Sequence, residues 1–198
     1  LKHNKAQKTL TWIGHASFLL QIDGVNILTD PHLTKRASPV SFAGPVRTTP
    51  PGLKIKDLPI IDIIVISHNH YDHLDSQSIR QINKQQKNNQ PLILVPLKLK
   101  SLLESFGATN VKELGWWDNI EFKNLKLHSV PVQHWSNRSF NRNKTLWCGW
   151  VIKTSSFKTF FCGDTGYSKD FLTIQEKFDY MDLSLIPIGA YAPRWFMK

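Results

Sequence analysis

The chain has 198 residues, and its 41% hydrophobic and 20% charged content is typical of a globular protein rather than a disordered one. No apolar run approaches the roughly 18 residues of a membrane-spanning helix, and no signal-peptide core is visible, so we expect a cytoplasmic location. The net charge of +10 favours anionic partners. The two cysteines are too few for a disulfide framework and are expected to be reduced.

The first part of the chain predicts two strands within residues 9–31, joined by a hairpin turn at Asp23-Gly24. A long loop rich in proline, serine and threonine follows, from Pro31 to about Pro59, and loops of this length are usually functional or flexible. Residues 61–67, IDIIVIS, form a continuous β-branched run that indicates a strand buried on both faces. Asp75 then stands where it can cap a polar helix.

The second part of the chain alternates short strands with two further helices. An amphipathic helix is predicted in residues 97–107, closed by Gly107, and a later helix near residues 169–177. Strands are predicted at 91–96, 111–114, 119–122, 125–132, 147–154, 158–162 and 181–187. Hairpins mixed with strand–helix crossovers predict an α+β fold whose sheets are covered by helices. No linker divides residues 1–198, so we assign one domain.

Four potential metal ligands follow the buried strand in the pattern H-x-H-x-D-H: His68, His70, Asp72 and His73. Ligand sites gather at the carboxyl ends of strands, and imidazole with carboxylate but no thiolate suits a borderline divalent metal. His68 and His70 can reach one ion from an extended segment, whereas Asp72 and His73 can face a second. The alternative is a polar loop that caps the next helix, but the spacing directly after a buried strand favours metal binding.

Further ligands are expected downstream, because four side chains cannot fill two metal sites. His134 stands at the end of another predicted strand, and Asp164 lies in a Gly-Asp-Thr-Gly turn after a third apolar run. A lone histidine or turn aspartate is usually structural. Both residues lie at strand ends after the histidine motif, however, and we therefore count them as candidate ligands.

These motifs resemble those of the metallo-β-lactamase superfamily. The segments TWIGHASFLLQIDGVNILTDP, SHNHYDHLD, PVQHWSNRS, CGDTGY and IPIGAYAPRWFMK further resemble the branch of N-acylphosphatidylethanolamine-hydrolysing phospholipases D, from about Leu10 to Lys198. The resemblance implies a metallo-β-lactamase αββα sandwich with two zinc ions at one edge. It assigns His68, His70 and His134 to the first ion, Asp72 and His73 to the second, and Asp164 as the bridge.

The resemblance also implies a hydroxide between the two ions as the nucleophile, with Asp72 both binding a metal and orienting the water. Asp30 is expected to hold a site histidine and in this way to support catalysis. His15 follows a strand, and a structural role is as well supported as a role in the site. Tyr71 and Tyr191 are candidate substrate-binding residues, and Trp135 and Trp195 are further candidates for a lipid pocket, although core packing explains tryptophans equally.

One departure from the family concerns the second ion, to which the family supplies a histidine beyond the PRWFMK segment. This chain has no histidine after His134, so we expect the second site to lack that ligand and the last part of the fold to be absent.

The leading hypothesis is a zinc-dependent phospholipase D-type phosphodiesterase that cleaves N-acylphosphatidylethanolamine or a related phospholipid at an anionic membrane surface. A long apolar loop that exposes Phe42 and Val46 would favour the lipid. Two alternatives stay open: a hydrolase of the same fold acting on a phosphorylated lactone or cyclic nucleotide, and an inactive truncated homologue that binds an anionic surface. A nucleic-acid partner is not expected, and a homodimer is compatible with the sequence.

Overall fold

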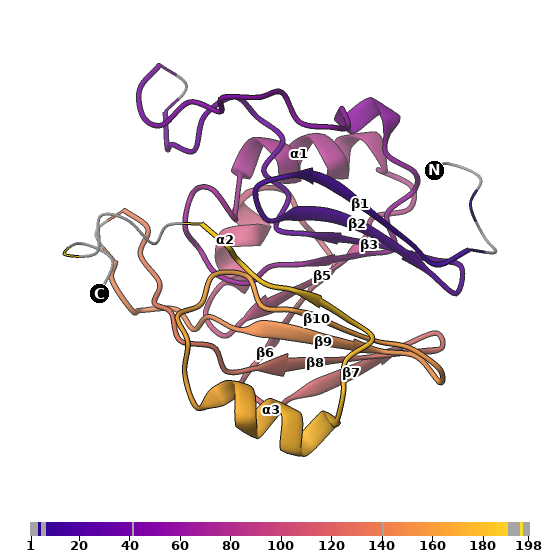
Figure 1. Cartoon of the computed structure of the whole chain (residues 1–198). Coiled ribbons are helices and arrows are strands. Elements are labelled where there is room, and N and C mark those ends of the chain that lie inside the picture. The colour runs from indigo at the N-terminus through magenta and orange to yellow at the C-terminus, as the bar shows by residue number, and fades with distance from the viewer. Residues whose placement is uncertain (1–3, 5–6, 41, 140, 190–194, 196–198) are drawn as a thin grey trace.

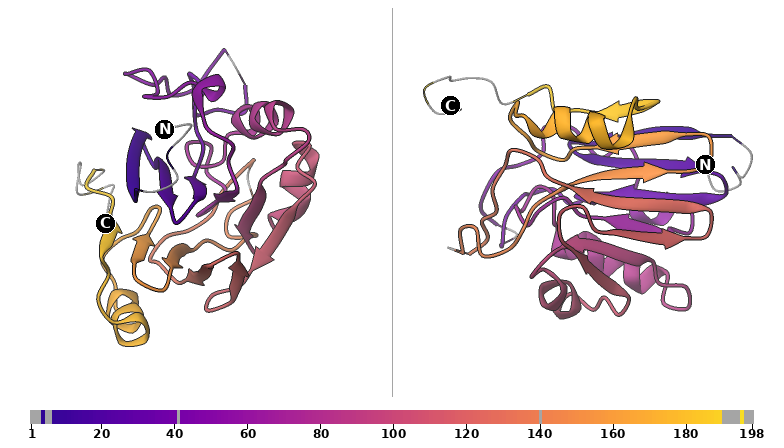
Figure 2. Two further views of the ribbon diagram at one scale, coloured as in Figure 1. Left: turned by 90° about the vertical axis from the view of Figure 1, so that its right-hand side faces the viewer. Right: turned by 90° about the horizontal axis from the view of Figure 1, so that it is seen from below.

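Two β-sheets pack face to face in the computed structural model, which describes residues 4, 7–40, 42–139, 141–189 and 195. The first sheet has six strands in the order β1-β2-β3-β4-β5-β6, and the second has five in the order β11-β10-β9-β8-β7. Helices α1 and α2 cover the outer face of the first sheet, and α3 covers the second (Figures 1 and 2). This confirms the predicted αββα sandwich.

The first sheet begins with an antiparallel meander and continues with parallel strands joined by helices. Its strands are β1 (Thr9–Gly14), β2 (Ser17–Ile22), β3 (Val25–Thr29), β4 (Ile63–Val65), β5 (Leu92–Pro96) and β6 (Val111–Leu114). The helical segments of this half are the short 3-10 helix η1 (Ile55–Asp57), α1 (Ser76–Gln85) and α2 (Lys100–Ser105).

The second sheet is antiparallel except at its last pair, where β11 runs parallel to β10 after α3. It consists of β7 (Asn119–Phe122), β8 (Leu125–Val130), β9 (Gly149–Lys153), β10 (Lys158–Phe161) and β11 (Leu183–Leu185), with α3 (Asp170–Phe178) before the last strand. Across the described ranges, no helix is long and apolar enough to cross a bilayer.

The N-terminal prediction of two strands is wrong, because the structure has three. Gly14 at φ +142° and His15 at φ +51° interrupt the first apolar run, and a strand cannot continue through positive φ values. The hairpin turn at Asp23-Gly24 is confirmed, with φ of +49° and +78°. The Asp75 cap is confirmed as well, since its carboxylate accepts hydrogen bonds from the amides at the start of α1.

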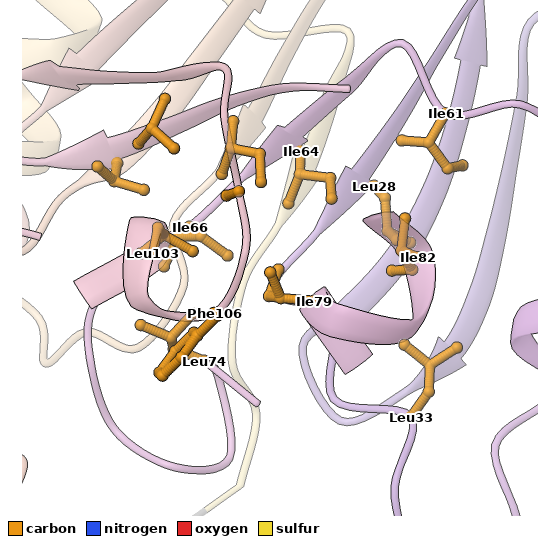
Figure 3. Close-up of a cluster of buried hydrophobic side chains, with 14 of the residues drawn as sticks. Leu28, Leu33, Ile61, Ile64, Ile66, Leu74, Ile79, Ile82, Leu103 and Phe106 are labelled. Atoms are coloured by element: carbon orange, nitrogen blue, oxygen red, sulfur yellow. The ribbon is translucent and has the colours of Figure 1, made fainter. Parts of the chain in front are cut away.

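Strand β4 is the centre of the hydrophobic core, as its β-branched composition predicted. Ile64 faces α1 and α2 in the cluster that Figure 3 shows, whereas Ile63 and Val65 lie in the layer between the two sheets. Trp150 packs in that same layer and donates its indole N–H to the carbonyl of Ile66 at 2.9 Å. The end of β4 is therefore held from both sides, which gives the loop that follows a rigid base.

Candidate metal centre

Four strands deliver the candidate ligands to one edge of the sandwich. Strands β3 and β4 are parallel neighbours, and β8 and β10 also run in the same direction because each is antiparallel to β9. Their carboxyl ends carry, in chain order, Asp30, the loop from His68 to His73, His134 and Asp164. Figure 1 shows these strand ends on the left side of the molecule.

Three histidines converge on one point. The Nε2 of His68 lies 2.8 Å from the Nδ1 of His70, and the Nε2 of His134 lies 3.1 Å from the first atom and 3.3 Å from the second. Three ring nitrogens in a triangle cannot all be satisfied by hydrogen bonds to one another, because every pair needs one donor and one acceptor. A cation at the centre satisfies all three lone pairs, as in metal sites that use imidazole ligands.

A second group of donors lies beside the three histidines. The Nε2 of His73 lies 3.1 Å from the Nε2 of His15, 3.3 Å from an oxygen of Asp164 and 3.7 Å from an oxygen of Asp72. That Asp72 oxygen is 3.0 Å from His15, and the Asp164 oxygen is 3.8 Å from the Nε2 of His134. Asp164 thus lies between the two groups, and its bridging role stays a prediction.

The structure therefore brings together all six residues predicted as ligands and adds His15, whose role the sequence had left open. The positive φ values of Gly14 and His15 turn the chain at the end of β1 and direct the imidazole toward Asp72 and His73. Sequence reasoning could not decide this, because the turn is invisible in the pattern of apolar residues.

The donor set fits a divalent cation with nitrogen and oxygen ligands. His68, His70 and His134 form one group whose donor atoms all lie within 4.8 Å of one another, and His15, Asp72 and His73 form another. No thiolate is involved: both cysteines are buried, and burial raises the pKa of Cys162 to about 12. Zinc accepts this combination of imidazole and carboxylate.

A buried network fixes which nitrogen of His68 and of His73 faces the centre. Asp30 accepts hydrogen bonds from the Nδ1 of His73 at 2.7 Å, from the amide of Ser67 at 2.7 Å and from the Ser67 hydroxyl at 2.5 Å. The Ser67 oxygen in turn lies 2.9 Å from the Nδ1 of His68 and accepts its N–H. The Nε2 atoms of both histidines are left free for a cation.

Gly163 lets the turn that carries Asp164 approach this network closely. Its φ is +62°, and a Cβ atom there would stand 2.4 Å from the Cβ of Ser67. Any larger residue would push the turn away and move Asp164 from the site. The Gly-Asp-Thr-Gly motif is thus explained by packing as well as by its acidic residue.

Most of the candidate ligands are in the protonation state that binds a cation. Burial lowers the pKa of His68 well below its usual value and, with neighbouring histidines, lowers that of His134 to about 4, so both are neutral at pH 7. Burial also works against a proton on His73, but hydrogen bonds with Asp164 and Asp30 raise its pKa well above the usual value. The His73 hydrogen bond holds the pKa of Asp164 low despite burial. A bound cation would replace the proton on His73.

Arg138 was missed by sequence reasoning and holds the ligand loop in place. Its guanidinium donates to the carbonyls of Asn69 and Leu74, at 3.0 and 2.9 Å, and lies 4.0 Å from the ring centre of Tyr71. These carbonyls lie within and just after the H-x-H-x-D-H segment. Nothing in the residue pattern signalled the contact, which spans more than sixty positions of sequence.

The aromatic residues predicted to bind substrate lie in different surroundings. The Tyr71 ring is covered by Arg138, and its hydroxyl hydrogen-bonds Ser139 at 3.0 Å, so its role toward substrate stays a prediction. Trp135 lies with its ring centre 4.5 Å from that of His70 and forms a wall of the site. Tyr191 lies outside the described residues, and Trp195 is largely exposed.

Comparison with known proteins agrees with this geometry. A family model described as a β-lactamase superfamily domain matches residues 25–198. The chain belongs to the metallo-β-lactamase superfamily. The resemblance predicted from the sequence is thereby confirmed, and the fold and the candidate metal-binding groups support a metal-dependent hydrolase.

Members of the superfamily that resemble the chain include two phospholipases. It is 41% identical over 207 residues to N-acyl-phosphatidylethanolamine-hydrolyzing phospholipase D 1 of Caenorhabditis elegans, covering 99% of this chain and 58% of that protein. The mitochondrial enzyme of the same name from Saccharomyces cerevisiae is 37% identical, covering 95% of this chain and 41% of that protein. The chain spans about half the length of the curated relatives it matches.

Solved structures support the fold alone. A possible metal-dependent hydrolase from Veillonella parvula superposes with a TM-score of 0.71 at 22% identity, covering 88% of this chain and 69% of that one. Igni18, a metallo hydrolase from Ignicoccus hospitalis, superposes with a TM-score of 0.67 at 21% identity, covering 91% of this chain and 70% of that one.

Proposed function

We propose that the chain forms the metal-binding core of a zinc-dependent phosphodiesterase of phospholipase D type that hydrolyses N-acylphosphatidylethanolamine. The observation that carries this proposal is the position of Asp164 between two donor groups, 3.3 Å from His73 and 3.8 Å from His134. A carboxylate shared in this way suits two adjacent cations, and paired cations serve in-line displacement at phosphorus. The similarity to two phospholipases of this specificity supports the choice of substrate.

Two zinc ions, when bound, would lower the pKa of water and neutralise charge on the phosphoryl oxygens. His68, His70 and His134 would bind one ion, and His73, Asp72 and His15 the other. Asp72 is part exposed and is therefore placed to accept a hydrogen bond from a reacting water and orient it. Asp30 keeps His73 in its orientation and makes no contact with substrate in this scheme, because it is completely buried.

The long loop after β3 meets the condition that favours a lipid substrate. Phe42 is 81% exposed and Val46 is 45% exposed, and exposed apolar side chains grouped on one segment indicate an interaction site. A hydrolase of small, charged phosphates needs no such apolar exposure beside its site. The phospholipid is therefore favoured over a phosphorylated lactone or a cyclic nucleotide.

The test is hydrolysis of N-acylphosphatidylethanolamine in detergent micelles by zinc-loaded protein, followed by mass spectrometry of the lipids. Water should cleave the phosphorus–oxygen bond to the ethanolamine group and give phosphatidate and N-acylethanolamine in equal amounts. Asp164→Asn should abolish this, and Asp179→Asn, an exposed acidic residue at the end of α3, is the matched control. Absence of phosphatidate, with turnover of a cyclic nucleotide or lactone, would refute the proposal.

A further inference from the structure

A preformed projection stands at the same edge of the sandwich as the metal centre. Residues 34–40 and 42–47, here called the finger, fold back on themselves: the Ala37 amide donates to the Pro45 carbonyl at 3.1 Å, and the Arg47 amide to the Lys35 carbonyl at 2.9 Å. Arg36 also donates to the carbonyl of Gly44 at 2.6 Å, across the tip. Figure 1 shows the finger extending outward at the upper left, above the strand ends of the site.

The base of the finger is fixed to the turn that carries His15. The Arg47 guanidinium donates to the carbonyls of His32 and Thr34, the second at 3.4 Å. It packs where Gly14 has no side chain, since a Cβ atom there would stand 2.5 Å from an Arg47 nitrogen. The finger and the metal centre are therefore held in a fixed relation.

Three apolar side chains of the finger are exposed, two near its tip and one on a limb. Phe42 is 81% exposed, Val46 45% and Val40 39%, so three hydrophobic side chains stand in solvent on one short segment. Single exposed apolar residues are normal on a protein surface, whereas a group of them on a projecting segment indicates an interaction site. A structural explanation from core packing does not apply, because none of the three belongs to a buried cluster of the described residues.

All the charged residues of the finger and of the segment after it are basic. The stretch from Pro31 to Lys56 contains no aspartate or glutamate, and its bases are Lys35, Arg36, Arg47, Lys54 and Lys56. For Lys35, Arg36 and Lys54, no ion pair with a carboxylate is found among the residues that the structure describes. Their charge is thus available to an external anion.

We infer that the finger docks the chain on an anionic phospholipid membrane, with Phe42 inserted among the lipids and the bases at the headgroups. An apolar tip with bases behind it matches the layering of such a surface, where hydrocarbon lies below and anionic groups above. A nucleic acid offers phosphates but no apolar layer for Phe42. The inference rests on the proposed function, because docking serves catalysis only if the substrate is a membrane lipid. A docked finger would place the metal centre at the membrane, where the lipid enters.

The test is sedimentation with vesicles of phosphatidylcholine alone and of phosphatidylcholine with phosphatidylserine, neither of which carries the proposed substrate. The chain should bind the anionic vesicles and release them at high salt. Phe42→Ser should weaken binding about tenfold, since burial of the ring is lost. Lys35→Glu should weaken it by about the same factor. The matched controls are Leu172→Ser, an exposed apolar residue on α3, and Lys112→Glu on β6, which should bind as the wild type does.

Equal binding by Phe42→Ser and the wild type would overturn the inference, and so would wild-type protein that does not bind anionic vesicles. Phe42 is exposed, so its variant should unfold at the wild-type temperature, which the same preparations can verify. Turnover of micellar N-acylphosphatidylethanolamine separates the two proposals. Without wild-type turnover in micelles the proposed function fails, whereas vesicle binding still decides the role of the finger.

Discussion

The Nδ1 of His73 lies 2.7 Å from a carboxylate oxygen of Asp30, and both side chains are completely buried. The same carboxylate accepts the Ser67 amide and hydroxyl, and Ser67 in turn orients His68. One buried acidic residue therefore fixes the histidines of two different donor groups. Asp30 thus determines the shape of the centre through its hydrogen bonds to His73 and Ser67.

Asp30→Asn should lower the affinity for zinc by about 10- to 100-fold, because removing the partner of a ligand histidine typically has this effect. Competition with a chromophoric chelator measures the affinity. Asp23→Asn is the matched control, since Asp23 lies in an exposed turn at positive φ that asparagine also tolerates. Unchanged zinc affinity in Asp30→Asn would show that the buried network does not position the ligands.

Arg138→Ala should destabilise the chain by about 2–4 kcal/mol, since two carbonyls would lose a charged hydrogen-bond donor. Arg138→Lys should recover only part of this loss, because an ammonium group cannot replace the planar guanidinium over Tyr71. Urea unfolding measures both. Arg142→Ala, an exposed arginine over Trp135, should cost less than about 1 kcal/mol. If Arg138→Ala were as mild as this control, the ligand loop would not depend on Arg138.

His15→Ala should weaken the second of two zinc-binding steps at least about tenfold and leave the first unchanged, because His15 contacts only the second donor group. Isothermal titration with zinc resolves the two steps. His128→Ala is the control, since His128 packs beside Phe178, away from the centre. Equal losses in both steps, or none, would rule out a separate ligand role for His15.

His128 predicts a specific loss of stability in acid. Burial and the charges of Lys126, Lys153 and Lys177 lower its pKa to about 4 in the folded chain. The unfolded chain, with the ordinary value near 6.5, binds the proton first, so the free energy of unfolding falls as the pH drops from about 6.5 to about 4. His128→Gln should remove about 1 kcal/mol of this loss, a modest amount because the ring is only part buried.

The measurement for His128 is urea unfolding of both proteins at several pH values with chelator present, so that the metal centre contributes equally. As the pH falls, the free energy of unfolding of the wild type should decrease more than that of His128→Gln. A difference that stays constant between about pH 7 and about pH 4.5 would show that His128 keeps its ordinary pKa.

Features that depend on local sequence were predictable. The bounds of β6 and β7, the cap at Asp75 and the turn at Asp23-Gly24 are set by neighbouring residues and were found as expected. The histidine motif after β4 was equally visible, because a buried strand and its ligands are adjacent in the chain. The structure also places His134 and Asp164 beside this motif.

Features that depend on distant contacts were not predictable. The break between β1 and β2 comes from positive φ at Gly14 and His15, where Arg47 packs from 33 positions away. Because the sequence does not reveal that turn, it could not show whether His15 belongs to the site. The contacts of Arg138 with the carbonyls of Asn69 and Leu74 likewise appear only when loops from separate strands are brought to one edge.

The most direct test of the metal centre is elemental analysis of the purified chain after loading with zinc and removal of the excess. The wild type should retain zinc, and His68→Ala and Asp164→Ala should each lose metal together with thermal stability, because ligand loss weakens both. Lys112→Ala, on β6, should retain wild-type content. Wild-type zinc content in both ligand variants would contradict the metal centre described here.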